Sequence, residues 1–153
     1  MIPEESVFNY LDIKDKIFQS IASNPWNKLF KRELIDRSGI KFQEIRNAND
    51  LLFVYSLLVE ANSISFLDEA LVCYRINNPK SLQRTKSDSW ECIFLAFYAL
   101  KIRLEYIGCF TSVENSFINK FFRSVFYYMR SVDSKTRKIM ECAFANKYYS
   151  LFD

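Results

Sequence analysis

The chain has 153 residues, of which half are hydrophobic and 17% aromatic; its net charge is +3 and it contains no histidine. This length fits one domain with a sizeable core, and the lack of a strongly basic block gives no case for nucleic acid as a partner. Without histidine, any proton transfer must fall to a carboxylate, a lysine or a tyrosine. With only two glycines and three prolines, the composition favours long helices over turn-rich β structure.

The cysteines and the N-terminal residues bear on the compartment. The four cysteines are widely spaced without a C-x-x-C pair and stand in apolar contexts: Cys73, Cys92, Cys109 and Cys142. This pattern predicts buried, reduced thiols and no metal site. Neither a signal peptide nor an apolar run long enough to span a membrane is visible. We therefore predict a cytoplasmic protein, with peripheral contact at the inner membrane face left open.

The first half of the chain predicts short elements. Apolar spacing in residues 6–22 predicts a helix. An extended piece follows at 26–30, then a helix at 31–38 with Gly39 as its C-terminal cap. A further helix is expected from about residue 50 to 61, with Asn49 as its N-cap.

The middle of the chain predicts strands and a loop. Residues 64–67 and 71–76 read as two strands joined by a turn. The polar stretch 77–89 reads as a loop, expected to be mobile between 77 and 87. Its three basic residues are interpreted as solvated: Lys80, Arg84 and Lys86.

The remainder predicts three helices. The first runs from Trp90 and stops at Gly108. A capping-box pattern at residues 111–114 opens the second, and Asp133 caps the third. The fold class is therefore α+β and predominantly helical, with a few short strands and a C-terminal three-helix extension. We expect residues 1–87 and 88–153 to form one compact unit.

The order of several short motifs resembles the second half of a family 2 glycosyltransferase with a GT-A-type fold. The matching residues are 26–32 (W-N-K-L-F-K-R), 39–42 (G-I-K-F), 49–53 (N-D-L-L-F) and 64–75 (I-S-F-L-D-E-A-L-V-C-Y-R), with Ser81 beyond. No single motif is specific, but their order within about sixty residues indicates the family. The resemblance implies an inverting sugar transfer in polysaccharide biosynthesis, from a nucleotide donor to a glycan or lipid-linked acceptor.

Two features depart from the family pattern. Asn49 stands where the family has the first acid of an acidic pair, and residues 1–23 supply neither the nucleotide-binding half nor its Asp-x-Asp metal motif. Such a half needs on the order of 100 residues. The resemblance therefore implies a truncated or separately encoded half that is inactive alone. The nucleotide sugar and divalent metal belong to the complete family fold, and this chain is expected to bind no cofactor or metal itself.

The resemblance also assigns roles to residues. Asp50 becomes the candidate general base; the alternative is that it only complements its helix dipole, a position that would lower its pKa. Trp26, Asn27 and Lys28 become acceptor contacts, although a core anchor is the favoured role for Trp26. Arg75 and Ser81 fall in the segment that closes over the nucleotide diphosphate; a solvated arginine is the favoured alternative for Arg75.

Two functions stay open. The first is this glycosyltransferase half. The second is a non-enzymatic helical module that binds a protein partner through exposed aromatic side chains. In either case we expect a homo-oligomer, most simply a dimer, or a complex with a separate nucleotide-binding half.

Overall fold

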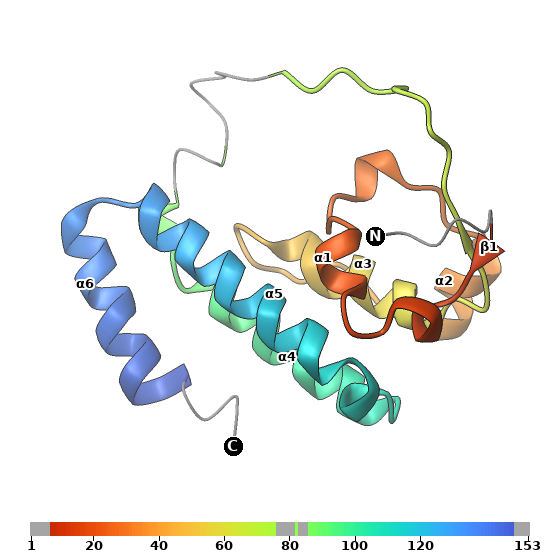
Figure 1. Cartoon of the computed structure of the whole chain (residues 1–153). Helices are drawn as coiled ribbons and strands as arrows, with labels where there is room; N and C mark the ends of the chain where they lie inside the picture. The colour runs from red at the N-terminus through yellow and green to blue at the C-terminus, as the bar shows by residue number, and fades with distance from the viewer. Residues whose placement is uncertain (1–6, 76–81, 83–85, 149–153) are drawn as a thin grey trace.

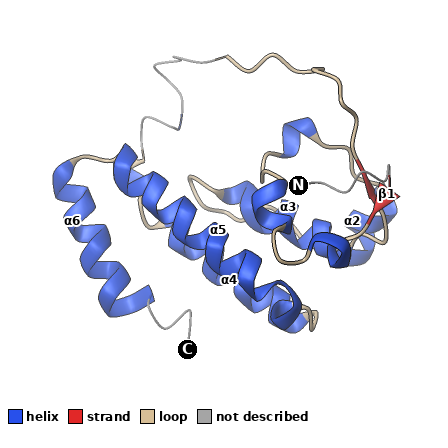
Figure 2. Ribbon diagram, in the orientation of Figure 1, coloured by secondary structure: helices blue, strands red, loops and turns tan. Residues whose placement is uncertain are grey.

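A computed structural model describes residues 7–75, 82 and 86–148. Within them the chain is mostly helical, with one two-stranded antiparallel sheet, as Figure 1 and Figure 2 show. This confirms the predicted, predominantly helical α+β class. No helix among the described residues is both long enough and apolar enough to cross a bilayer.

The N-terminal segment is broken into short pieces, so the single helix predicted for residues 6–22 is wrong. Strand β1 (Val7–Phe8) precedes a 3-10 turn, η1 (Tyr10–Ile13), and one helical turn, α1 (Ile17–Ser20). The Asn9 side chain accepts a hydrogen bond from the Leu11 amide at 2.8 Å, and the Asp12 carboxylate accepts one from the Asn9 amide at 2.7 Å. These two bonds fix a turn start at Asn9 and prevent a helix from running through it.

Helix α2 (Arg32–Ser38) ends as predicted. Its C-terminal cap is Gly39, whose φ of 62° lies in the left-handed region, where glycine carries no steric penalty. The preceding segment forms a 3-10 turn, η2 (Pro25–Asn27), which replaces the first two residues of the extended piece expected at 26–30; Lys28 is extended. Proline at the start of that turn supplies a φ suited to it.

Helix α3 (Asn49–Glu60) lies at the centre of the fold. Seven of its hydrophobic residues are buried: Leu51, Phe53, Val54, Tyr55, Leu57, Leu58 and Val59. Buried residues around nearly the whole helix are typical of a central core element. It packs against α2 on one side and α4 on another.

The C-terminal part forms three helices, as predicted. Helices α4 (Cys92–Tyr106) and α5 (Phe110–Ser131) lie side by side, and α6 (Ser134–Ala143) packs on α5 (Figure 1). Gly108, with φ of 75°, ends α4 as expected. Helix α5 begins at Phe110, with Cys109 as its N-cap and no side-chain cap, so the capping box expected at 111–114, with Thr111 as the N-cap, is wrong. Asp133 does cap α6, accepting from the Thr136 amide at 2.9 Å.

Two sets of polar contacts join the N-terminal part to the C-terminal helices. The Ser116 hydroxyl of α5 accepts from the Phe18 amide at 3.0 Å and donates to the Gln19 side chain at 2.7 Å. The Arg103 guanidinium of α4 donates to Glu60 at 2.6 Å and to the Ser38 carbonyl at 2.9 Å. A continuous core of buried side chains runs through both parts.

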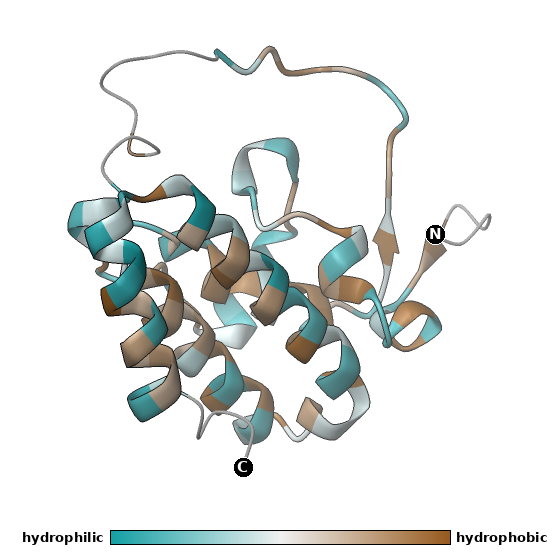
Figure 3. Ribbon diagram, turned by 60° about the vertical axis from the view of Figure 1, so that its left-hand side comes forward, coloured by the Kyte–Doolittle hydropathy of each residue, from teal (hydrophilic) through white to brown (hydrophobic). Residues whose placement is uncertain are grey.

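The predicted strands are mostly absent. Strand β2 is limited to Ile64–Ser65, which pairs with β1. The described part of the second predicted strand, residues 71–75, has no strand partner and is exposed. Residues 66–75 instead leave the body of the fold as an extended arc (Figure 1). Hydrophobic and hydrophilic residues are interspersed along it in Figure 3.

The cysteines are free, but only Cys109 is buried. Cys73 lies in the exposed arc and Cys142 on the exposed side of α6, so the prediction that all four are buried is wrong. The loop predicted to be mobile, 77–87, lies mainly outside the described residues.

Candidate functional site

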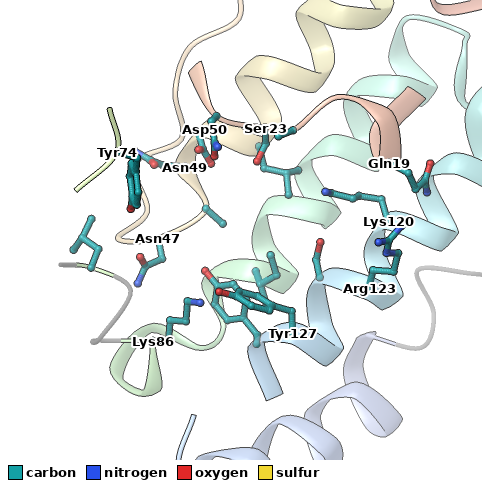
Figure 4. A pocket seen from close by; sticks show the side chains of 18 residues that line it. Gln19, Ser23, Asn47, Asn49, Asp50, Tyr74, Lys86, Lys120, Arg123 and Tyr127 are labelled. Atoms are coloured by element: carbon teal, nitrogen blue, oxygen red, sulfur yellow. The ribbon is translucent and has the colours of Figure 1, made fainter. Parts of the chain in front are cut away.

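A pocket of about 630 Å³ opens where the two parts of the chain meet (Figure 4). Its walls come from the end of α1 and the residues after it, the start of α3, Tyr74 of the exposed arc, and the middle of α5. This volume lies within the roughly 300–1,000 Å³ of small-molecule sites. Many lining side chains are polar, which suits a hydrogen-bonding ligand.

Asp50 lies in the first turn of α3 and lines this pocket, as expected for its position. Burial raises the pKa of the Asp50 carboxyl above its usual range. Hydrogen bonds from the backbone amides of Asp50 and Leu51, and the charge of Lys28, oppose that shift but do not cancel it. The expectation that the helix start lowers this pKa is therefore wrong, because desolvation outweighs the amide donors.

The residue before α3 has an unusual backbone. Ala48 adopts φ of 58° and ψ of 16°, so it, and not Asn49, is the N-cap, and no side chain caps the helix. A left-handed conformation costs a residue other than glycine about 1–2 kcal/mol. Such strained residues cluster at functional sites. Here the strain lies directly beside Asn49 and Asp50, which line the pocket.

Three basic side chains line the pocket. Lys86 is only 3% exposed, and its ammonium lies 4.1 Å from the centroid of the Tyr127 ring and 4.9 Å from that of Tyr128. The interpretation of Lys86 as a solvated loop residue is therefore wrong. Lys120 and Arg123 reach the pocket from α5.

Sequence reasoning missed the contribution of α5. Lys120, Arg123 and Tyr127 follow one another at spacings of three and four residues, which places them on one face of a helix. That spacing predicts a polar helix face, but the apolar residues beside it led to the interpretation that α5 serves only to form the core. The face could be recognised as a pocket wall only once α5 was placed opposite α3.

Lys120 lies next to a buried tyrosine. Its ammonium is 5.8 Å from the centroid of the fully buried Tyr55 ring. Burial and the nearby charge of Arg123 lower the pKa of Lys120. The Tyr55 hydroxyl donates to the Phe18 carbonyl at 3.1 Å. Burial and the nearby charge of Asp50 raise the pKa of the Tyr55 hydroxyl, so this phenol stays neutral.

The motif at residues 26–28 lies beside the pocket and does not line it. Trp26 is 48% exposed and stacks on Tyr74 with ring centroids 5.5 Å apart, so the core-anchor role favoured for Trp26 is wrong. The Lys28 ammonium donates to the Asn24 carbonyl and to the Asn27 side chain, both at 2.8 Å. Burial lowers the pKa of Lys28, and the charge of Asp50 opposes that shift.

The remaining predicted site residues are not brought to the pocket. Arg75 is exposed at the end of the described arc and is not among the lining residues. Ser81 lies outside the described residues. Asp50 is the one carboxylate among the described lining residues, and the described residues hold no group of three metal-ligating side chains. They therefore do not fit the divalent metal of the complete family fold.

Part of the chain is similar in sequence to a known glycosyltransferase. Over 58 residues the chain is 45% identical to a Bacillus subtilis (strain 168) protein described as "Uncharacterized glycosyltransferase EpsJ". The match covers 37% of this chain and 17% of that protein, so the aligned segment is a small part of its length. No family model and no solved structure matches the chain. The shared segment relates this chain to a glycosyltransferase.

Proposed function

We propose that this chain is the acceptor-side part of an inverting glycosyltransferase in polysaccharide biosynthesis, with Asp50 as the general base. The acceptor hydroxyl oxygen bonds to the anomeric carbon of a nucleotide sugar while the bond from that carbon to the diphosphate breaks. The Asp50 carboxylate takes the hydroxyl proton, and the diphosphate leaves with the electron pair. The placement of Asp50 carries the proposal: a carboxylate with a raised pKa lines a polar pocket in a chain partly identical to a glycosyltransferase.

The rest of the pocket suits a sugar. Tyr74 and Tyr127 offer aromatic rings, which pack on the apolar faces of pyranose rings. Asn47 and Asn49 offer amides that can donate to and accept from sugar hydroxyls. The Asn47 amide already donates to the Ser89 hydroxyl, which fixes its orientation. The exposed ring of Trp26, stacked on Tyr74, extends the aromatic surface beyond the pocket.

Donor binding then requires a nucleotide-binding unit, on the same or on a separate polypeptide. The exposed arc 66–75 is the proposed contact. Its apolar side chains are half-exposed or more: Phe66, Leu67, Leu71, Val72 and Tyr74. An extended segment with unpaired backbone groups pairs readily with the edge of another sheet. The arc would become a strand once such a sheet is present.

A second candidate is a non-enzymatic interaction module. It is favoured by exposed apolar side chains outside the arc, above all Leu29 at 103% and Tyr106 at 79%. Side chains of this kind mark protein contacts when they form a continuous patch. In this reading the pocket would have no saccharide ligand and Asp50 no catalytic role.

The first of two measurements on the isolated chain separates these functions, and the second tests the need for a nucleotide-binding unit. Titration with a panel of neutral and acidic oligosaccharides, followed by amide NMR shifts, should perturb Asn49, Asp50 and Tyr127. Incubation with nucleotide sugars and manganese should release no nucleotide diphosphate. Failure of every saccharide to perturb the pocket contradicts the glycosyltransferase proposal. Tight, manganese-dependent binding of a nucleotide diphosphate contradicts the need for a second unit.

A further inference from the structure

The charge of the pocket is unbalanced. Among the described lining residues, the cations Lys86, Lys120 and Arg123 face one carboxylate, Asp50. No ion pair joins any of these three cations to a described carboxylate. The carboxylate and the pair Lys120–Arg123 come from different helices, α3 and α5, and so occupy different walls (Figure 4).

Two of the three cations, Lys86 and Lys120, are held in place by packing against tyrosine rings. Lys86 is buried, with its charge held against two tyrosine rings, an arrangement that stabilises a cation out of water. Lys120 is half-buried above Tyr55, and Figure 4 shows its side chain pointing into the pocket. Two like charges one helical turn apart are mutually unfavourable, and an anion between them would relieve that repulsion.

From this juxtaposition, and resting on the function proposed above, we infer that the acceptor is acidic. Lys120 and Arg123 bind a carboxylate or phosphate on it, while Lys86 supplies a fixed positive charge at the same wall. The arginine fork suits either anion through two parallel hydrogen bonds. An anionic group held at α5 would leave a neighbouring sugar hydroxyl free to approach Asp50 from across the pocket.

The test compares pairs of ligands in which one member carries an anionic group and the other does not. A tetrasaccharide of alternating glucuronate and glucose is titrated beside its carboxyl-reduced, all-glucose counterpart. Glucose 1-phosphate, with glucose as its neutral partner, represents the phosphate of a lipid-linked acceptor. Dissociation constants come from amide NMR shifts. We expect at least one acidic ligand to bind about tenfold or more tightly than its neutral partner, and the arm that does so identifies the anion.

Substitutions of Lys120 and Arg123 test whether these residues bind the anionic group. Arg123→Gln and Lys120→Gln should each remove most of the preference for the acidic ligand, while Lys120→Arg, which retains the charge, should keep it. Arg123 is exposed, so its substitution leaves the fold intact. Lys138→Gln, on the exposed side of α6, is the matched control and should change nothing. The preference should also fall with added salt.

The outcomes separate the inference from the proposed function. Equal binding of acidic and neutral saccharides at Asp50 and Tyr127 overturns the inference and leaves the proposed function standing. A preference that survives both Arg123→Gln and Lys120→Gln also overturns it, since the anion then binds elsewhere. Failure of all saccharides to bind overturns both.

Discussion

Trp26 and Tyr74 stack with their ring planes at 16° and their centroids 5.5 Å apart, although both side chains are about half exposed. The two residues belong to segments far apart in the chain. Trp26 follows α1, whereas Tyr74 stands near the end of the arc that leaves the fold after β2. The stack therefore holds the arc beside the pocket that Tyr74 lines.

Replacement of Trp26 should release the arc. A stacked aromatic pair contributes about 0.5–1.5 kcal/mol beyond its burial, so Trp26→Ala should increase the open population of the arc several-fold. Trypsin cleavage after Arg75, followed by mass spectrometry, reports that population when opening is fast. The control is Leu29→Ala, because Leu29 is fully exposed. Equal cleavage rates in the two variants would show that the stack does not restrain the arc.

The ion pair between Arg103 and Glu60 should contribute to stability. Both side chains are largely buried, at 18% and 17% exposure, and hydrogen bonds to charged groups are worth about 1.5–3 kcal/mol. Glu60→Gln should lower the free energy of unfolding by about that amount, measured by urea denaturation. Arg103→Gln should cost more, because Arg103 also donates to the Ser38 carbonyl.

An exposed ion pair serves as the control for the Arg103–Glu60 pair. Arg32 and Asp36 form an ion pair at 91% and 66% side-chain exposure, where such pairs contribute about 0–1 kcal/mol. Asp36→Asn should therefore leave the unfolding midpoint nearly unchanged. A cost for Glu60→Gln no larger than that for Asp36→Asn would mean that the buried pair adds nothing.

The aromatic core predicts a large loss of stability on substitution of Phe97 and a small loss on substitution of its neighbour Tyr98. Phe97 is fully buried and meets Phe117 and Phe121 edge to face, with centroids 5.6 Å and 5.2 Å away. Phe97→Ala should destabilise the protein by about 3–5 kcal/mol, since it leaves a cavity in the core. Tyr98, the next residue of α4, is 53% exposed, and Tyr98→Ala should cost less than about 0.5 kcal/mol. Similar losses would contradict the orientation of α4.

Asp50 should make stability depend on pH. Because burial raises its pKa in the folded protein, the folded state binds the proton more tightly than the unfolded state. Its contribution to stability therefore falls as pH rises from the unfolded pKa of about 3.9 through the folded value. Asp50→Asn should raise Tm at neutral pH and leave it unchanged at pH 3, where the carboxyl is protonated in both states. A lower Tm for Asp50→Asn at neutral pH would contradict the raised pKa.

Exposed aromatic side chains on α4 and α5 predict association between copies of the chain. Tyr98, Tyr106, Phe126 and Tyr127 are all more than half exposed, on α4 and α5. Monomers rarely leave a large continuous apolar patch uncovered. We expect a dimer in sedimentation at micromolar concentration, weakened by Tyr106→Ser or Phe126→Ser. A monomer that binds no hydrophobic dye would contradict the prediction.

Elements whose ends are marked by local chemistry could be predicted from the amino-acid sequence. Gly39 and Gly108 end helices because each supplies a left-handed φ, and Asp133 starts α6 because its carboxylate accepts a free amide. Apolar periodicity placed the three C-terminal helices, and the position of Asp50 in a first turn followed from the motif around it. These features depend on neighbours within a few residues, which a sequence displays directly.

Features that depend on partners distant in the chain could not be predicted in this way. Residues 7–8 became a strand and not the start of a helix, because β1 pairs with β2, nearly sixty residues away. The pocket forms because α5 lies opposite the start of α3, so that Lys120 and Arg123 line it together with Asp50. Lys86 is buried because two tyrosine rings of α5 receive its charge, and burial reversed the expected pKa shift of Asp50. Desolvation and opposed charges arise from packing between distant segments, so no local pattern could reveal them.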